Sequence, residues 1–351
     1  MWPRTDFLDL VGITHPVIQA PMSGFTPPAL AAAVSNAGAL GSIGCATLPP
    51  VAVREQVAIL REATNRPFNV NFFVHARPRA NPQAIASVQA KLAPYFDEFE
   101  LGPVPEPKEL FPTFDEERLD LVLALRPRVV SFHFGLPEAS AVRQIKEAGC
   151  VILSSATTVA EARLLEANGA DVVIAQGFEA GGHRGSFSSS PGAGMVGTMA
   201  LVPQIVDAVH IPVVAAGGIA DGRGLAAAFA LGASGAQIGT AFLGCPEATV
   251  SPLHRAQLRT ATDDGTELTR AFTGRPARAL RTSFIAQMAD TEPLEFPLQT
   301  SLLGPLWQLP SEEARAAFTP FWAGQAAPLV RELPASRLIE ELVAEARSKI
   351  A

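Results

Sequence analysis

Short apolar runs alternate with amphipathic segments along the first 245 residues. Each run is the right size for a fully buried parallel strand, and the segments between them carry helix-start and helix-stop residues. Thr158 followed by Glu161 predicts a capping box at the start of one helix, and Asp221 predicts the cap of another. The expected strands are 16–20, 40–43, 68–73, 129–132, 151–154, 172–175, 212–216 and 236–238.

Eight strands in alternation with helices predict an α/β fold, a closed TIM (β/α)8 barrel. An open, doubly wound sheet is the alternative. The glycine fingerprint GxGxxG, which would follow the first strand of a dinucleotide-binding sheet, is absent from this position. The sequence therefore favours the barrel.

The alternation stops after Cys245. We expect residues 1–245 to form the barrel, 246–310 a helical lid or second domain, and 311–351 C-terminal helices that pack back on the barrel. Within this part, 251–287 is predicted to be helical with a break at 273–276, and 293–310 to be irregular. Amphipathic helices are expected at 311–318 and 336–350. A lid at this place would exclude water from the barrel mouth.

Composition narrows the classes of partner. The chain has 351 residues, 48% of them hydrophobic, and a net charge of −7. It therefore offers no basic face for nucleic acid. Three scattered cysteines show no metal-ligand spacing and predict buried thiols in a reduced compartment. Neither a secretory signal nor a membrane-length apolar run is visible, so we expect a soluble, cytoplasmic protein with no metal. Monomer and homodimer both stay open.

A glycine-rich loop follows the sixth expected strand and contains His183 and Arg184. Imidazole can exchange a proton near neutral pH, which makes His183 the first catalytic candidate. A loop histidine bonded to its own backbone is the structural alternative. His133, at the end of the fourth strand, is the second candidate, although it lies in an aromatic stretch. Glu179 and Arg184 either orient His183 or form a surface ion pair. The other histidines, at 15, 75, 210 and 254, lack supporting context.

Glycine turns after the seventh and eighth strands predict a phosphate site. Gly217, Gly218, Gly239 and Thr240 place backbone N–H groups where barrels of this kind bind phosphate. The alternative is that they are only tight turns. Met22, Asn69 and Gln176 end other strands at the same mouth, where amides could pair with a flavin edge and a thioether could support the ring.

Eight motifs distributed in order over nearly the whole chain resemble those of the nitronate monooxygenases, which are FMN-dependent TIM-barrel enzymes. They are QAPMSG (19–24), FNVNF (68–72), SFHFG (131–135), AQGFEAGGHRG (175–185), AGGI (216–219), QIGT (237–240), FPLQ (296–299) and WAGQ (322–325). The long central motif is specific, whereas the glycine turns also occur in other phosphate-binding barrels.

The resemblance implies FMN as cofactor, oxidation of alkyl nitronates or nitroalkanes by dioxygen to a carbonyl compound and nitrite, and His183 and His133 facing the substrate. The implied cofactor-binding residues are Pro21, Met22, Ser23, Gly24, Asn69, Gln176, Gly181, Gly182, Gly217, Gly218, Gln237, Gly239, Thr240, Trp322, Ala323, Gly324 and Gln325.

One departure from the family concerns the segment 293–309, where some members carry tyrosines. Tyr95 is the only tyrosine of this chain, and the segment carries Gln299, Thr300 and Leu303 instead. We expect a less polar or differently shaped pocket. Two alternative functions stay open: an FMN-dependent NAD(P)H:quinone or enoyl-thioester reductase on the same barrel, and a non-catalytic barrel that binds a phosphate ligand.

Overall fold

The computed structural model describes residues 2–188 and 194–350, in which eight parallel strands form a barrel. The strands follow the order β1-β9-β8-β6-β5-β4-β3-β2. Closure between β1 and β2 is made by a bridge, in which Leu40 donates its N–H to Val17 O at 2.9 Å and accepts from Gln19 N at 3.0 Å. The predicted TIM barrel is confirmed. Its strands are β1 (Val17–Gln19), β2 (Gly41–Gly44), β3 (Phe68–Phe73), β4 (Val129–His133), β5 (Val151–Ala156), β6 (Val172–Gln176), β8 (Val213–Ala216) and β9 (Gly235–Ile238).

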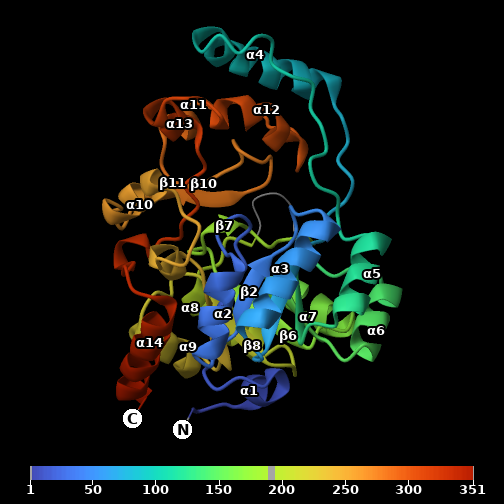
Figure 1. Cartoon of the computed structure of the whole chain (residues 1–351), viewed down its shortest axis with the longest axis vertical. Helices are drawn as coiled ribbons and strands as arrows, with labels where there is room; N and C mark the ends of the chain where they lie inside the picture. The colour runs from blue at the N-terminus through green and yellow to red at the C-terminus, as the bar shows by residue number, and fades with distance from the viewer. Residues whose placement is uncertain (1, 189–193, 351) are drawn as a thin grey trace.

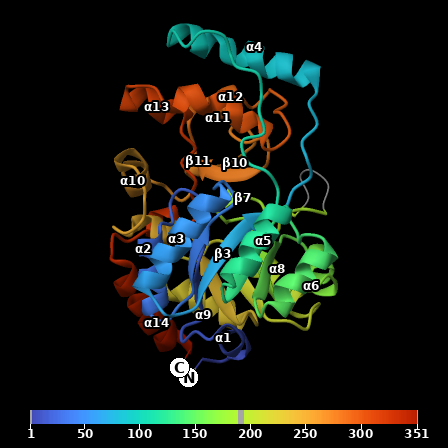
Figure 2. The same cartoon turned by 45° about the vertical axis from the view of Figure 1, so that its right-hand side comes forward.

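Helices cover the outside of the barrel, and α1 (Asp6–Val11) lies at its amino-terminal end (Figures 1 and 2). Both predicted N-caps are present: Thr158 Oγ1 accepts from Glu161 N at 3.2 Å, and Asp221 accepts from Arg223 N at 2.9 Å. The carboxylate of Glu161 accepts from Thr157 N at 2.7 Å and from Phe187 N at 2.8 Å, so the reciprocal bond of the predicted capping box is not made. The outer helices are α2 (Pro28–Asn36), α3 (Pro50–Ala63), α5 (Glu116–Leu125), α6 (Ala139–Glu147), α7 (Val159–Ala167), α8 (Thr198–Val206) and α9 (Gly222–Ala230).

A small antiparallel sheet lies over the carboxyl ends of the barrel strands (Figure 1). In it, β11 (Ala277–Leu280) pairs with β10 (Thr266–Thr269) and with β7 (Gly182–His183) of the glycine-rich loop. The prediction that 251–287 is helical apart from a break was therefore wrong for the residues of β10 and β11, which form strands. Their pairing partners lie outside each short segment, so local pattern could not reveal them. The helical parts of this stretch are α10 (Pro252–Arg259) and α11 (Ser283–Gln287).

Two further helices belong to the lid. The segment 293–310, predicted to be irregular, contains α12 (Leu298–Trp307), and α13 (Glu312–Phe318) follows it. The proline-broken excursion after β3 supplies α4 (Pro82–Glu98), which lies above α11 and α12 in both views (Figures 1 and 2). Its buried Val88, Leu92 and Phe96 share one apolar cluster with Phe284 and Phe318. The lid core is thus built from two parts of the chain that are distant in sequence.

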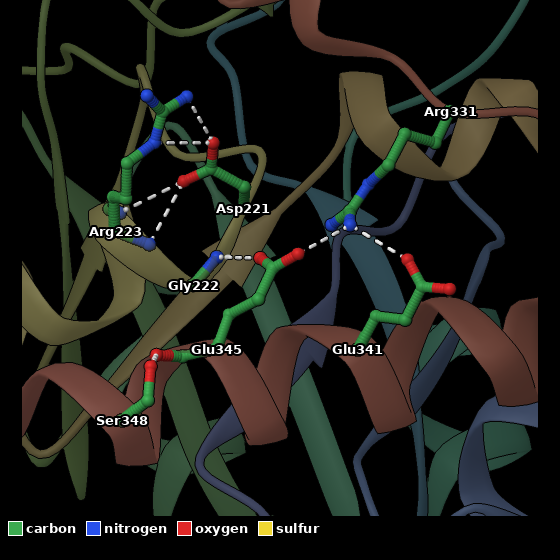
Figure 3. A network of polar contacts seen from close by, with 8 residues as sticks. Asp221, Gly222, Arg223, Arg331, Glu341, Glu345 and Ser348 are labelled. Atoms are coloured by element: carbon green, nitrogen blue, oxygen red, sulfur yellow. Dashed lines mark hydrogen bonds and ion pairs between the residues drawn. The ribbon is translucent and has the colours of Figure 1, made fainter.

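The C-terminal helix α14 (Ala335–Ile350) packs against α9 and α2. Glu345 accepts from Gly222 N at 2.8 Å, at the start of α9, and pairs with Arg331 at 2.7 Å (Figure 3). A Cβ at Gly222 would lie 2.2 Å from the Cβ of Glu345, so only glycine permits this approach. Arg331 also pairs with Glu341 at 2.8 Å. These contacts hold the last helix beside the N-terminus of α9.

Three further findings concern the described residues. Cys45, Cys150 and Cys245 are free and buried, as predicted. In 2–188 and 194–350, no three His, Cys, Asp or Glu side chains are grouped to hold a metal, and no helix is long and apolar enough to cross a membrane. Residues 1 and 189–193 of the expected barrel, and residue 351 of the expected C-terminal part, lie outside the described residues.

Candidate active site

A cavity of about 720 Å³ opens between the carboxyl ends of the barrel strands and the lid. Most residues that the sequence suggested for the site line it, whereas Asn69, Ala323 and Gln325 do not. The lining members are Pro21, Met22, Ser23, Gly24, His133, Gln176, Gly181, Gly182, His183, Gly217, Gly218, Gln237, Gly239, Thr240, Trp322 and Gly324.

His183 lies on β7, so the lid strand β11 fixes its backbone. Its Nε2 is 3.0 Å from Thr273 Oγ1, and its ring is surrounded by Phe73, Phe296 and Trp322, with centroids 5.4–6.1 Å away. Burial, with smaller contributions from the nearby His133 and Arg275, lowers the pKa of His183 to about 3. The imidazole is therefore neutral at physiological pH.

His133 lies beside it at the end of β4. Its Nε2 is 3.1 Å from the carbonyl oxygen of His183, which can only accept, so Nε2 carries the proton. Its Nδ1 is then the acceptor for Ser155 Oγ at 3.1 Å. Burial lowers the pKa of His133 to about 4. The second histidine is thus also neutral and has a single tautomer.

The side-chain amide of Gln176 bonds to the backbone of the glycine-rich loop that contains His183, called the histidine loop below. Its Nε2 donates to His183 O at 2.9 Å, and its Oε1 accepts from Gly185 N at 2.8 Å. Asn69 lies in the barrel interior, donating to Ser42 Oγ and Ser131 Oγ at 3.1 and 2.9 Å, while its Oδ1 is buried without a partner in the described structure. Asn71, two residues further along β3, lines the cavity and donates to Ser131 Oγ at 2.9 Å.

Glu179 and Arg184 do not form the surface ion pair that was one interpretation of them. Glu179 accepts from Thr198 N and Oγ1 at the start of α8, at 2.9 Å each. Arg184 is 1% exposed and donates to the carbonyl oxygens of Gly177, Gln176 and Gly194 at 2.5–3.0 Å. Arg184 is therefore an interior brace of the loop, and Glu179 fastens the loop to a helix N-terminus, where a carboxylate is favoured.

The glycine turns have the conformation of an anion cradle. Gly217 and Gly218 both have positive φ, 107° and 73°, and follow β8 directly. The short 3-10 helix η1 (Thr240–Gly244) begins right after β9. Loops after these two barrel strands, together with the start of a short extra helix, are the usual phosphate site of this architecture.

The donor set also fits the rest of an FMN. A Cβ at Gly182 or Gly24 would meet nothing within 4 Å, so open space adjoins the backbone there. Gln237 Oε1 is buried without a partner in the described structure and can accept from a ligand hydroxyl. The cavity volume lies in the range of small-molecule sites, about 300–1,000 Å³.

The segment after the lid, 322–325, is pinned against two loops of the barrel. Gly324 N donates to Thr240 Oγ1 and Gln325 N to Glu179 O, both at 2.9 Å. A Cβ at Gly181 would lie 2.5 Å from Gly324 N, which explains the two glycines. Ala323 is buried and Gln325 is exposed, so Trp322 and Gly324 are the residues of this motif that face the cavity.

The structure adds residues that the sequence did not indicate. Thr273 and Phe296 of the lid contact His183, and His254, which we set aside, is buried against the cavity with its ring between Phe25 and Phe321. Only the break at 273–276 and the FPLQ motif at 296–299 were visible beforehand, and neither carried a sign of contact with His183, which lies 90 positions before Thr273. In the segment 293–309, where some family members carry tyrosines, Thr300 lines the cavity. The side chain of Gln299 accepts from Leu294 N and donates to Ala271 O in the lid backbone. Phe73, Phe296 and Trp322 supply aromatic walls around His183, and the comparison of this pocket with those of tyrosine-bearing members stays a prediction.

Comparison with known proteins agrees with this geometry. A family profile described as Nitronate monooxygenase matches residues 4–345. A nitronate monooxygenase of Pseudomonas aeruginosa is 44% identical over 97% of this chain and 99% of its own length. The nitroalkane oxidase of Streptomyces ansochromogenes has a TM-score of 0.88 at 39% identity, with 98% of each chain covered. FabK of Thermotoga maritima has a TM-score of 0.77 at 33% identity, covering 99% of this chain and 98% of its own.

The match of the profile spans almost the whole chain, and the relatives align over nearly their full lengths. The motifs that carried the resemblance also lie around one cavity, with the two histidines at its centre. Members of this group are flavin-dependent oxidoreductases. The chain belongs to the nitronate monooxygenase family and is an oxidoreductase.

Proposed function

We propose that this enzyme uses FMN to oxidise alkyl nitronates with dioxygen, giving a carbonyl compound and nitrite. The observation that carries the proposal is a neutral His183, fixed by Thr273 and enclosed by aromatic rings in a cavity with a phosphate cradle. In this conversion two nitronate ions and one dioxygen give two carbonyl compounds and two nitrite ions, so each substrate carbon gains one oxygen atom as its bond to nitrogen breaks.

The residues that would hold FMN follow from the lining. Gly217, Gly218, Gly239 and Thr240 would bind its phosphate, Gln237 its sugar-like chain, and Met22 would support the ring. When bound, FMN supplies the electron-accepting group. We also assign residues 1–245 to the barrel, 246–310 to the lid and 311–351 to the C-terminal part.

The protonation state of His183 decides between two substrates. A histidine with a pKa of about 3 is a weak base, so it takes the α-proton of a neutral nitroalkane poorly. A nitronate has already lost that proton and needs only hydrogen bonds and an apolar enclosure that excludes water. The site therefore favours nitronates over nitroalkanes.

The test is oxygen consumption by the purified, FMN-loaded protein given an alkyl nitronate without NADH. We expect uptake with nitrite release, and kcat/KM at least about tenfold higher for the nitronate than for its nitroalkane. His183→Ala should keep FMN and lose most of the activity. Full activity of that variant would remove His183 from the reaction and contradict the proposal.

A reductase is the second candidate, because one barrel fold can serve several reactions. Anaerobic mixing with NADH separates the two. Rapid bleaching of the flavin, together with no oxygen uptake on nitronate, would favour a quinone or enoyl-thioester reductase. The non-catalytic phosphate-binding barrel is set aside, because the chain belongs to a family of oxidoreductases.

A further inference from the structure

The lid turn Thr273-Gly274-Arg275-Pro276 contacts the histidine loop through three of its four residues. Thr273 Oγ1 contacts His183 Nε2, and Pro276 O accepts from Arg184 N at 2.8 Å. Arg275 donates from its guanidinium to Ser186 O. The turn is fixed in place by Gly274, whose φ is +83° and whose Cβ position would fall 1.9 Å from Leu294 O.

Arg275 lies close to both histidines without lining the cavity. Its guanidinium carbon stands 3.8 Å above the centre of the Phe134 ring. The same ring contacts His133 and His183, with centroids 4.5 and 5.9 Å away. Phe134 has a φ of +74°, a strained conformation for a phenylalanine, so the fold holds this ring in its place against a backbone preference.

The surrounding charges are unevenly placed. Glu161, which is fully buried, accepts from the N–H groups of Phe187 and Ser188 at 2.8 and 3.2 Å, beyond the residue that Arg275 binds. Arg275 is the arginine whose positive charge lowers the pKa of His183. The pKa of His133 is lowered by Arg275 and Arg184 and raised by Glu161. Positive charge therefore predominates at the two imidazoles.

We propose that Arg275 is a positioning residue of the active site, which holds Phe134 and the 182–186 loop against the two histidines and supplies positive potential that favours an anionic substrate. Its selection of an anion rests on the proposed function, whereas its effect on the histidines does not. Arg275 acts through Phe134 and the 182–186 loop and does not touch the substrate.

Two replacements separate its charge from its hydrogen bond. Arg275→Gln keeps a donor for Ser186 O and removes the charge, and Arg275→Lys keeps the charge without the planar fork. The control is Arg278→Gln. Arg278 is also a lid arginine over an aromatic ring, with its guanidinium 4.4 Å from the Phe178 ring and a bond to Phe178 O at 3.1 Å, but it is not among the charged groups that act on the two histidines.

The first readout is the titration of His133 and His183 by NMR of the FMN-loaded, histidine-labelled protein, with signals assigned from His133 and His183 variants. In Arg275→Gln we expect both titrations to move up by about one pH unit, since a nearby cation disfavours the imidazolium. Arg275→Lys and Arg278→Gln should titrate as the wild type does. An unchanged titration in Arg275→Gln, or an equal shift in Arg278→Gln, overturns the proposal.

The second readout is KM for an alkyl nitronate against KM for the matching neutral nitroalkane. Arg275→Gln should raise the first by about tenfold and leave the second within about twofold, because only the anion loses a charge interaction. Equal changes for both substrates overturn the anion-selecting role. If the wild type oxidises neither, the proposed function fails, and the titration still decides the role of Arg275 toward the histidines.

Discussion

At the scale of single residues, side chains that looked like ligand contacts serve to shape the loop that carries His183. Gln176, expected to pair with a flavin edge, bonds to the backbone at residues 183 and 185. Glu161, expected to complete a capping box, accepts from Thr157 N at 2.7 Å and from the histidine loop. The sequence placed Gln176 at the barrel mouth and Glu161 at the start of a helix. It could not predict their partners in the histidine loop, because a local pattern carries no information on contacts between separate segments.

Replacing Gln176 should therefore affect stability and activity together. Gln176→Leu leaves Gly185 N unpaired in the interior and removes one of two donors to His183 O, which should cost about 1–3 kcal/mol of unfolding free energy. We expect kcat/KM on nitronate to fall by about ten- to a hundredfold as the imidazole loses its position. Urea denaturation and steady-state kinetics measure the two effects.

The matched control is Gln204→Leu, which removes an exposed side-chain bond to Ala200 O on α8. This variant should stay within about 0.5 kcal/mol of the wild type. Equal behaviour of the two variants would show that the Gln176 bonds do not hold the loop.

At the scale of elements, the barrel was predictable and the lid sheet was not. Barrel strands such as β6 are continuous apolar runs because both faces are buried, and that pattern is local. Strands β10 and β11 read Thr-Glu-Leu-Thr and Ala-Arg-Ala-Leu, without a continuous apolar run. These strands form only by pairing, β10 with β11 and β11 with β7, and β7 lies about 90 residues earlier in the chain. Long-range pairing of this kind decides where His183 faces.

The lid turn should tolerate no side chain at residue 274. Gly274→Ala places a Cβ 1.9 Å from Leu294 O in a backbone with φ of +83°, so we expect a loss of several kcal/mol in stability and a displaced Thr273. Thermal melting and nitronate turnover provide the measurements.

Gly304→Ala, in α12, is the comparison. Nothing lies within 4 Å of its Cβ position, and alanine is favoured over glycine in a helix by about 0.5–1 kcal/mol. It should therefore melt at the same or a higher temperature. A Gly274→Ala protein as stable and active as the Gly304→Ala protein would contradict the assigned role of the turn.

At the scale of the whole molecule, the enclosure of the cavity also links stability to pH. Burial lowers the pKa of His183 to about 3 and of His133 and His254 to about 4, against 6.5 when exposed. These histidines are neutral in the folded protein, and the unfolded chain binds up to three more protons between about pH 6.5 and pH 4. Their stabilising contribution is thus present above pH 6.5 and is lost as the pH falls.

We therefore expect the unfolding free energy to decline from pH 7 to pH 5, with a limiting slope of about 1.4 kcal/mol per pH unit for each histidine that is neutral only when folded. Urea denaturation at a series of pH values measures it. His254→Phe removes one of these groups from a site between two phenylalanine rings and should make the slope shallower, because one proton fewer is taken up on unfolding. A stability independent of pH between 7 and 5 would mean that the histidines are not kept neutral by the fold, and the preference for nitronates would lose its physical basis.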